Sequence, residues 1–235
     1  MSKLYPTVLD EQDDAAALPE AREPFEFAAK RPRFLEAADD APTGAERRTA
    51  THLFMQFCDF SRFAGQTVTE ARVREEAARL AYARFLTERA ASLCDVNRLV
   101  RFFESRLFGE ICASAGVWRE HRFNVKLPAA RFTGDARLRA ELADETILVQ
   151  GVIDCFFENP DGTLTLIDYK TDFIPPHLSE AEARAMLISR HGLQLAYYNE
   201  ALRRIAAREV SRVGIWSFGM NREIFLTDTE RSAAF

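Results

Sequence analysis

Lysine is scarce in this sequence, and several features that would mark a particular class of protein are missing. Only four of the 31 basic residues are lysines, namely Lys3, Lys30, Lys126 and Lys170, so arginine carries nearly all of the positive charge. No apolar run approaches the roughly 20 residues that cross a bilayer, and the N-terminus lacks the basic and then apolar pattern of a secretory signal. We therefore expect a cytoplasmic protein without a membrane partner.

Cysteine motifs are also lacking. The four cysteines, Cys58, Cys94, Cys112 and Cys155, stand far apart, and none of them forms a C-x-x-C pair. This spacing suggests neither a zinc site nor a disulfide framework, and it argues against an iron–sulfur cluster. We expect these cysteines to be buried apolar thiols.

An excess of positive charge is missing too. The chain carries 31 basic and 36 acidic side chains, which gives a formal net charge of −5 at pH 7. A basic domain would attract nucleic acid over much of its surface, whereas here any contact with DNA must be local. The sequence also has no G-x-x-x-x-G-K-[ST] motif, so we expect no ATPase motor within this chain.

The composition divides the chain into a short first part and a long second part. Residues 1–42 are acidic and rich in proline, with little periodicity, and we expect them to be a partly disordered tether or linker. Residues 43–235 have the periodic patterns of a folded domain, and one domain is favoured over two.

Helical patterns come first in the second part. Thr43 and Glu46 have the spacing of a capping box, and apolar residues then recur at helical spacing. Thr67-x-x-Glu70 predicts the start of a second helix. A third helix is expected to begin at Asp95 and to continue until Gly116 stops it.

Strand patterns dominate from residue 117 onward. Apolar and polar residues alternate over 123–127, and two β-rich runs follow at 147–157 and 163–170. Two final strands are expected at 210–220 and 223–227.

One helical stretch interrupts these strands. It begins at Ser179-x-x-Glu182, and we expect it to break near Gly192 and then to resume. The fold class predicted is α+β, with a mixed central β-sheet flanked by helices and an N-terminal helical cap over residues 43–115.

The turn between the two β-rich runs fixes which residues face each other. Gly162 supplies the left-handed residue of a three-residue loop, so that Asn159 pairs with Thr163. Counting back along both strands places Asp154 opposite Asp168, with Cβ atoms about 5 Å apart. Two opposed carboxylates on apolar strands repel each other unless a proton or a cation lies between them.

A hard divalent cation suits this pair best. Carboxylate oxygens without a nearby thiolate indicate Mg²⁺ or Mn²⁺, which keeps bound water as the source of a nucleophile. Lys170 shares the strand face of Asp168 and reaches the same cleft. There it could orient or deprotonate the water, or stabilise charge on a phosphoryl oxygen. The whole set suits phosphodiester hydrolysis.

Each residue, taken singly, also has an ordinary structural interpretation. Lys170 could be a solvated partner of an aspartate, and His52 could be a core or surface histidine. Gln194 and Tyr198 lie at positions i and i+4 of one helix face, where a polar pair is more often structural than catalytic. Glu120 could be a charge at a strand edge. Only the joint register of the two aspartates and the lysine favours a site.

Four motifs in order resemble a known family. They are a helical TATHLFMQF that contains His52, GVID (Gly151–Asp154), IDYKTD (Ile167–Asp172) and LQLAYYNEAL (Leu193–Leu202). Together they resemble the RecB-type nuclease domain of the PD-(D/E)xK superfamily, in particular the AddA-type nucleases, over roughly residues 43–228. The D-Y-K triplet alone would be weak, but four motifs with this order and spacing are strong.

The resemblance implies a restriction-endonuclease-like core and a set of metal ligands. The expected ligands of Mg²⁺ or Mn²⁺ are His52, Asp154, Asp168 and the main-chain carbonyl of Tyr169. Lys170 would be the catalytic lysine that acts with the two aspartates.

Further residues are implied to lie around the metal. Gln194 and Tyr198 match the family's Q-x-x-x-Y helix, which would help to position DNA. Glu120 would support the ligands without being one of them. His191 stands where many relatives are expected to have a tyrosine.

The same resemblance implies a function within a larger machine. The chain would be a metal-dependent DNA exonuclease, the C-terminal nuclease part of an AddAB- or RecBCD-type helicase–nuclease in double-strand break repair by recombination. Its partners would be an AddA motor region, joined through residues 1–42, an AddB-like subunit, and single-stranded DNA delivered by the helicase, with the 3′-ended strand as substrate. Its place would be the bacterial cytoplasm, in association with the nucleoid.

Two other functions stay open at this point. A stand-alone RecB- or Cas4-like exonuclease is one, although a Cas4-like protein would be expected to carry cysteines for an iron–sulfur cluster. A catalytically silent module that binds DNA or docks a partner is the other. The retention of Asp154, Asp168 and Lys170 disfavours the silent module, and a nuclease assay with and without Mg²⁺ would separate the two.

Overall fold

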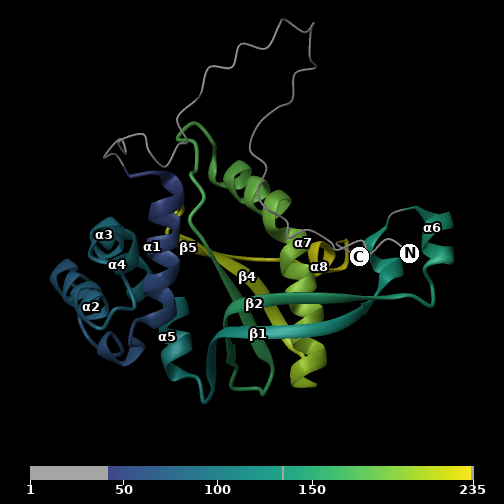
Figure 1. Cartoon of the computed structure of the whole chain (residues 1–235), viewed down its shortest axis with the longest axis horizontal. Coiled ribbons are helices and arrows are strands. Elements are labelled where there is room, and N and C mark those ends of the chain that lie inside the picture. The colour runs from purple at the N-terminus through teal and green to yellow at the C-terminus, as the bar shows by residue number, and fades with distance from the viewer. Residues whose placement is uncertain (1–41, 134, 234–235) are drawn as a thin grey trace, which may run out of the picture. The chain divides into compact units, whose positions relative to one another are not determined.

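The structure, a computed structural model, describes residues 42–133 and 135–233, and the tether expected over residues 1–42 falls outside them except for Pro42 (Figure 1). Within the described part, a five-stranded sheet lies between helices. In chain order the elements are α1 (Gly44–Phe57), η2 (Phe60–Arg62), α2 (Glu70–Tyr82), α3 (Glu88–Leu93), α4 (Val96–Phe103), α5 (Arg106–Ala113), β1 (Val117–Pro128), η3 (Ala129–Phe132), α6 (Ala136–Glu141), β2 (Thr146–Glu158), β3 (Leu164–Lys170), α7 (Glu180–Ala206), β4 (Val210–Ser217), β5 (Arg222–Phe225) and α8 (Asp228–Ala233).

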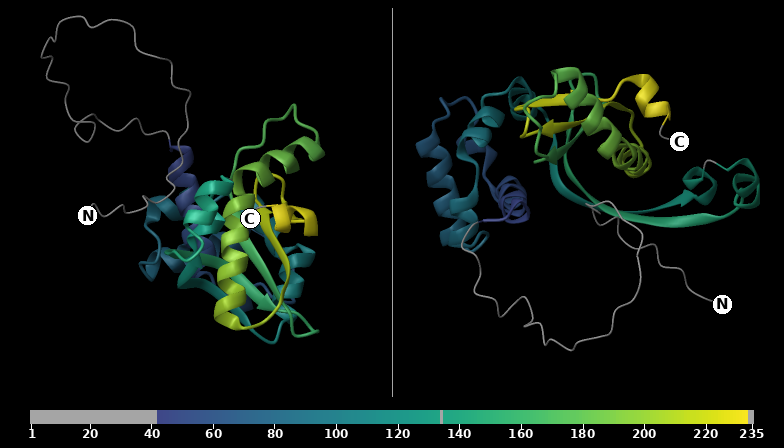
Figure 2. Two further views of the ribbon diagram at one scale, coloured as in Figure 1. Left: turned by 90° about the vertical axis from the view of Figure 1, so that its right-hand side faces the viewer. Right: turned by 90° about the horizontal axis from the view of Figure 1, so that it is seen from above.

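The sheet is mixed, which confirms the predicted α+β class. Its strand order is β1-β2-β3-β4-β5, and neighbouring strands are antiparallel except for β3 and β4, which are parallel. Since a parallel pair needs a crossover connection, the long helix α7 joins β3 to β4. The far ends of β1 and β2 extend with η3 and α6 away from the rest of the sheet (Figures 1 and 2).

Two apolar cores hold the layers together, one on each face of the sheet. Residues of α1, α2, α4 and α5 form the first core with Ile167, Tyr169 and Trp216 of the sheet. The second core joins the opposite face to α7 through residues such as Leu166 and Leu195. Because successive side chains of a strand point to opposite faces, Asp168 shares the α7 side with Leu166.

The helical region before the sheet, α1 to α5, is called the cap below, and two predictions within it are wrong. α2 begins after Thr69, whose side chain accepts a hydrogen bond from the Arg72 N–H, so Thr67 is not the capping residue. The single helix expected from Asp95 is two helices, α4 and α5, because the Ser105 hydroxyl caps a new start by accepting from the Phe108 N–H at 3.1 Å.

The break predicted near Gly192 is absent, since α7 is one helix of 27 residues. A Cβ at Gly192 would meet only Ile188, at 3.7 Å, so this glycine is not required by packing. The apolar contacts of α7 with the sheet outweigh the modest cost of a glycine inside a helix. The helix changes direction along its length, as Figures 1 and 2 show.

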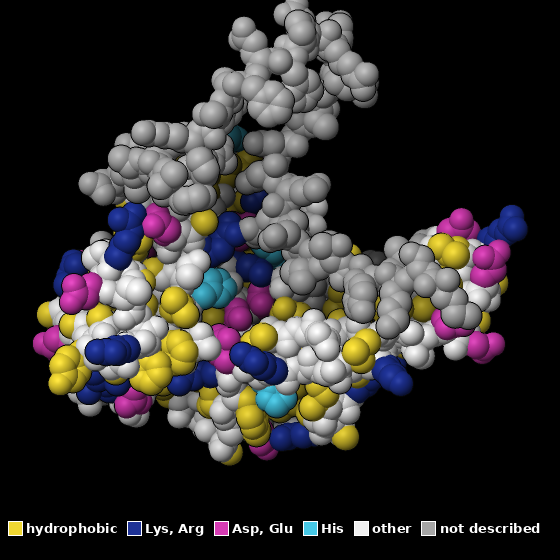
Figure 3. Space-filling model, viewed as in Figure 1, with side chains coloured by type: hydrophobic (Ala, Val, Ile, Leu, Met, Phe, Trp, Pro, Cys, Tyr) yellow, Lys and Arg dark blue, Asp and Glu magenta, His cyan; other side chains and the backbone are white. Residues whose placement is uncertain are grey.

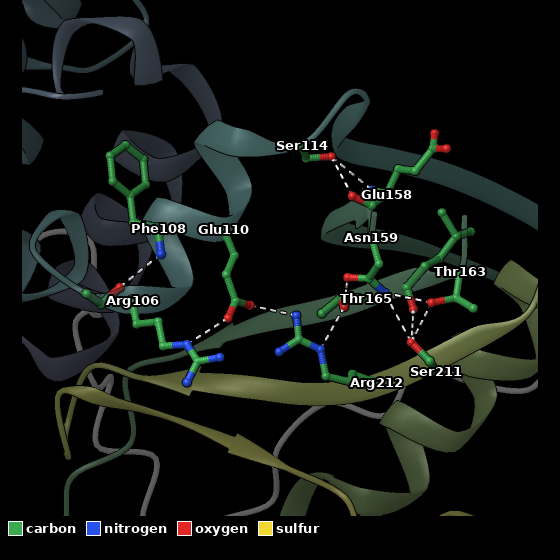
Figure 4. Close-up of polar contacts among 12 residues, drawn as sticks. Arg106, Phe108, Glu110, Ser114, Glu158, Asn159, Thr163, Thr165, Ser211 and Arg212 are labelled. Atoms are coloured by element: carbon green, nitrogen blue, oxygen red, sulfur yellow. Dashed lines mark hydrogen bonds and ion pairs between the residues drawn. The ribbon is translucent and has the colours of Figure 1, made fainter. Parts of the chain in front are cut away.

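The hairpin that joins β2 to β3 has the predicted register. Gly162 has a φ of +83°, and the Asn159 N–H donates to the Thr163 carbonyl at 2.8 Å. A polar network then ties this end of the sheet to the cap (Figure 4). Arg212 of β4 donates to Glu110 of α5 at 2.6 Å and to the Thr165 hydroxyl at 3.1 Å.

Among the described residues, no helix combines the length and the apolar character that a membrane span requires.

Candidate active site

The candidate site lies where β2 and β3 stop pairing. The last pair of their ladder is Cys155 with Ile167, so Asp154 and Asp168 follow at the point where the two strands separate. The Tyr169 N–H donates instead to Oδ2 of Asp154 at 2.7 Å. The predicted register therefore holds up to the aspartates, but the ladder itself ends one pair before them.

Lys170 is held between the sheet and α7. Its Nζ lies 2.8 Å from Oδ2 of Asp168 and donates to Oε1 of Gln194 at 2.9 Å. The Gln194 amide in turn donates to the Tyr198 hydroxyl at 3.0 Å. The predicted Q-x-x-x-Y face of the helix thus meets the lysine, and Gln194 fixes the direction in which the ammonium points.

His52 reaches the same place from the cap. It lies in α1, and its Nδ1 is 4.0 Å from Oδ2 of Asp154. Figure 3 shows acidic, basic and histidine side chains gathered in a hollow between α1 and α7. The fold therefore brings together residues that are separated in the sequence by more than 140 positions, from His52 to Gln194.

Glu120 interrupts the ladder between β1 and β2. Arg119 pairs with Cys155 and His121 pairs with Ile153, so Glu120 faces Asp154 across the gap between these pairs. Its φ is +50°, which is unusual for a residue with a side chain. A strained backbone at one residue is typical of functional sites, where the surrounding structure keeps it in place.

Like charges crowd the site. Burial raises the pKa of Asp154 well above its usual range, and the charges of Asp168 and Glu120 raise it further. Burial also raises the pKa of Glu120, and Asp168 contributes to this rise. Ionising all three carboxyl groups is thus costly unless positive charge lies among them.

Lys170 supplies part of that positive charge. Burial alone would lower its pKa, but the carboxylates of Asp168 and Asp154 raise it above the usual value. The side chain is therefore a cation at neutral pH, with only 17% of its surface exposed.

The donor set fits a hard divalent metal ion. Asp168 is only 4% exposed in its side chain, and its Oδ2 accepts no hydrogen bond although it lies beside the Lys170 ammonium. Across residues 42–133 and 135–233, no three histidine, cysteine or acidic side chains meet closely enough to hold an ion by themselves. The two aspartates would consequently need His52 or a backbone carbonyl to complete a ligand set, and oxygen ligands of this kind suit Mg²⁺ or Mn²⁺.

The glycine of the GVID motif has a packing reason. A Cβ at Gly151 would lie 2.7 Å from the Phe123 ring and 3.2 Å from Cε1 of Tyr198. Phe123 and Tyr198 are in edge-to-face contact at 5.4 Å between ring centroids. Gly151 thereby leaves room for the ring whose hydroxyl contacts Gln194.

Two features of the site have no counterpart in the sequence predictions. Asp172, the last residue of IDYKTD, forms ion pairs with His191 at 3.0 Å and with Arg190 at 3.1 Å, which ties the segment after β3 to α7. The helical spacing of His191 and Gln194, at i and i+3, was the available signal that both lie on one face.

The other feature is Arg119, which joins the cap to the sheet. Its Nη1 donates to the carbonyls of Met55 at 3.2 Å and Cys58 at 2.8 Å, at the C-terminal end of the helix that carries His52. The guanidinium also lies 4.2 Å from the centroid of the Phe60 ring. No sequence spacing marks this contact, because its partners are backbone carbonyls about 60 residues away.

Comparison with known proteins agrees with this geometry. The profile of the PD-(D/E)XK nuclease superfamily matches residues 21–233. Similar curated proteins include the AddA chain of the ATP-dependent helicase/nuclease of Bacillus cytotoxicus, 34% identical over 221 residues, which are 93% of this chain and 17% of that protein. The corresponding proteins from Acetivibrio thermocellus and Anoxybacillus flavithermus are 35% and 37% identical, over 80% and 84% of this chain and 14% and 15% of their own lengths.

The chain thus spans 14–17% of the length of these relatives. The resemblance to AddA-type nucleases that the motifs indicated is confirmed. With a family match that covers most of the chain, and a sheet that carries Asp154, Asp168 and Lys170 at one point, this chain belongs to the PD-(D/E)XK nuclease superfamily.

Proposed function

We propose that the chain is a metal-dependent deoxyribonuclease that hydrolyses single-stranded DNA. The observation that carries this proposal is the group of buried carboxylates beside a lysine. Asp168 pairs with Lys170 at 2.8 Å, and burial and neighbouring charge raise the pKa of Asp154. Such a concentration of mutually perturbed groups costs stability, so it is expected where chemistry requires it.

The proposed metal ligands are Asp154, Asp168, His52 and the carbonyl of Tyr169. The Tyr169 N–H already holds Asp154 in place, and the Tyr169 ring is buried in the core, which leaves its backbone free to serve the site. When bound, Mg²⁺ or Mn²⁺ would polarise a phosphoryl oxygen and lower the pKa of a water molecule.

Lys170 and its neighbours would do the remaining work. As a cation, Lys170 would orient the attacking water and stabilise negative charge on the phosphoryl group. Gln194 keeps the ammonium in position, and the Tyr198 hydroxyl orients Gln194. Glu120 would support the ligands through its charge.

The relatives, which are named as ATP-dependent helicase/nucleases, suggest the setting in which this chemistry is used. We propose that the chain works beside an AddA motor region and an AddB-like subunit, which would deliver a single strand, the 3′-ended one, during double-strand break repair by recombination. The net charge of −5 supports delivery by a partner, since the chain has no general attraction for DNA. The bacterial cytoplasm, beside the nucleoid, is the proposed location.

A cleavage assay on the full chain tests the core of this proposal. End-labelled single-stranded and duplex DNA would be incubated with Mg²⁺, with Mn²⁺, and with EDTA. We expect single-strand cleavage with either metal and none in EDTA. Asp168→Asn should be inactive, whereas Asp144→Asn, an exposed aspartate in the turn before β2, should cleave like the wild type.

Two outcomes would contradict the proposal. Cleavage that persists in EDTA would exclude a metal-dependent reaction. Tight binding of DNA by the wild type without cleavage under any metal would identify the silent binding module. Labels on the 5′ and 3′ ends separately would reveal the strand end from which an exonuclease begins.

A further inference from the structure

A pocket of about 350 Å³ lies beside the candidate active site. Its lining includes Arg47, Arg48 and Thr51 of α1, Arg98 of α4, and Thr171 and Phe173 from the segment that follows β3. These six residues are called the arginine pocket below. None of them has a role in the proposed hydrolysis.

Positive charge exceeds negative charge in this pocket, in contrast to the chain as a whole. Asp95 is the acidic residue in the lining, and it is already engaged. Its side chain caps α4 and forms an ion pair with Arg98 at 3.1 Å, which holds that guanidinium at the pocket. Arg47 is exposed and forms no ion pair with any residue that the structure describes. An anion would therefore be attracted here.

The pocket continues directly from the candidate active site. Thr51 precedes His52 in α1, and Thr171 follows Lys170 at the end of β3. Two separate elements thus each give one residue to the pocket and the adjacent residue to the site. The hydroxyl oxygen of Thr171 is buried and has no hydrogen-bond partner. A ligand that reaches the aspartates and extends along α1 would meet these arginines next.

An exposed aromatic ring adds a second kind of contact. Phe173 is 71% exposed, although a phenylalanine of this kind is usually buried. Single-stranded nucleic acid is bound by cationic grooves that follow the backbone together with aromatic rings on which bases stack. Arginine suits the phosphate because its planar fork can donate two parallel hydrogen bonds to it.

We propose that the arginine pocket binds a phosphate of single-stranded DNA adjacent to the phosphodiester that is cut, with a neighbouring base stacked on Phe173. This inference rests on the proposed function for the choice of ligand. The pocket would position the strand, so that the scissile phosphate is presented to the aspartates in one orientation.

Binding measurements in EDTA test the pocket separately from hydrolysis. The affinity of the full chain for a labelled oligodeoxythymidylate would be measured by fluorescence anisotropy over a series of salt concentrations. In the double variant Arg47→Ala/Arg98→Ala we expect affinity to fall on the order of tenfold or more. The slope of log K against log salt should shrink by about 0.7, the value for one phosphate contact on a single strand.

Matched variants distinguish charge from fold. Arg137→Ala, an 89% exposed arginine of α6, should bind like the wild type. Arg47→Lys/Arg98→Lys should keep the wild-type salt slope because it keeps the charge. Phe173→Ala should lower affinity for the single strand by about fivefold or more without changing the slope.

The pocket and the proposed hydrolysis can fail independently. Absent wild-type binding, or an unchanged affinity and slope in the double alanine variant, would overturn the pocket even if the chain cleaves DNA. A reduced slope in that variant supports the pocket even if no metal gives cleavage, in which case only the proposed function fails.

Discussion

At the scale of single residues, electrostatics accounts for the candidate site better than packing does. Asp154, Asp168 and Glu120 raise one another's cost of ionisation, and Lys170 offsets only part of it. A buried ion pair is weak evidence for stability, because removing both charges from water costs about as much as their attraction returns. A role in chemistry is therefore the better explanation for these charges than a role in holding the fold together.

Replacing the lysine should separate chemistry from folding. We expect Lys170→Ala to keep its secondary structure and its affinity for Mn²⁺ but to lose single-strand cleavage by on the order of 100-fold or more, because a positioned cation then no longer stabilises the phosphoryl charge. Single-turnover cleavage, circular dichroism and Mn²⁺ calorimetry on one preparation would measure the three properties. Lys126→Ala, an exposed lysine of β1, is the control. Near-wild-type cleavage by Lys170→Ala would remove this lysine from the catalytic group.

Asp172 should make stability depend on pH. Burial acts to raise its pKa, but hydrogen bonds and charges from His191 and Arg190 lower it to about 2. A carboxyl group whose pKa is depressed in the folded state stabilises the fold above its unfolded pKa of about 4, and this contribution is lost as the pH falls from about 4 to about 2. The contribution at neutral pH is on the order of 2 kcal/mol.

Asp172→Asn should therefore lower the free energy of unfolding at pH 7 by about that amount, and by much less at pH 3. Urea unfolding of wild type and variant at both pH values measures the difference. Asp144→Asn serves as the exposed control. A deficit in Asp172→Asn that stays constant with pH would show that the carboxylate charge is not the cause.

At the scale of elements, local patterns predicted well where neighbouring residues decide the structure. The turn at Gly162 fixed the β2–β3 register, and period-two alternation located β1, β4 and β5. The wrong predictions have tertiary or competing local causes. Gly192 stays helical because α7 packs against the sheet, and Ser105 starts a helix in competition with the longer apolar pattern. The approach of His52 to Asp154 depends on how the cap docks, which no local pattern encodes.

Two glycines offer a matched test of these element-level arguments. Gly219 touches the segment after β3, since a Cβ there would lie 2.4 Å from the Asp172 carbonyl oxygen. Gly219→Ala should therefore destabilise the protein by about 1–3 kcal/mol and reduce cleavage by moving that segment. Gly192→Ala, with room for its methyl group, should stabilise α7 by about 0.5–1 kcal/mol. Thermal and urea unfolding would measure both, and equal effects of one sign would contradict the packing argument.

Arg119 tests how firmly the cap is joined to the sheet. Arg119→Met keeps an apolar side chain of similar length but removes the donors to the Met55 and Cys58 carbonyls. We expect a loss of about 1–3 kcal/mol in the free energy of unfolding, and a larger loss of cleavage than this alone would cause, because the helix of His52 shifts. Arg122→Met, an exposed position of the same strand, should change neither. Unfolding by urea and cleavage above the Mg²⁺ requirement would be compared for the two variants.

At the scale of the whole molecule, the site requires all layers at once. His52 comes from the cap, Asp154 and Asp168 come from the sheet, and Gln194 comes from the helix on the opposite face. An ion that binds this combination binds the folded state and not the unfolded chain. Its binding free energy therefore adds to the stability of the entire domain.

Mn²⁺ should consequently stabilise the wild type, and the aspartates should decide by how much. At a free Mn²⁺ concentration of 100 times its dissociation constant, the gain in the free energy of unfolding is about 2.7 kcal/mol. We expect Asp154→Asn to lose most of this gain. In EDTA the same variant should be at least as stable as the wild type, because asparagine still accepts the Tyr169 N–H while the repulsion by Asp168 is relieved. Asp144→Asn should respond to Mn²⁺ like the wild type. Equal stabilisation of wild type and Asp154→Asn by Mn²⁺ would exclude Asp154 as a ligand, and a less stable Asp154→Asn in EDTA would show that this carboxylate serves the fold.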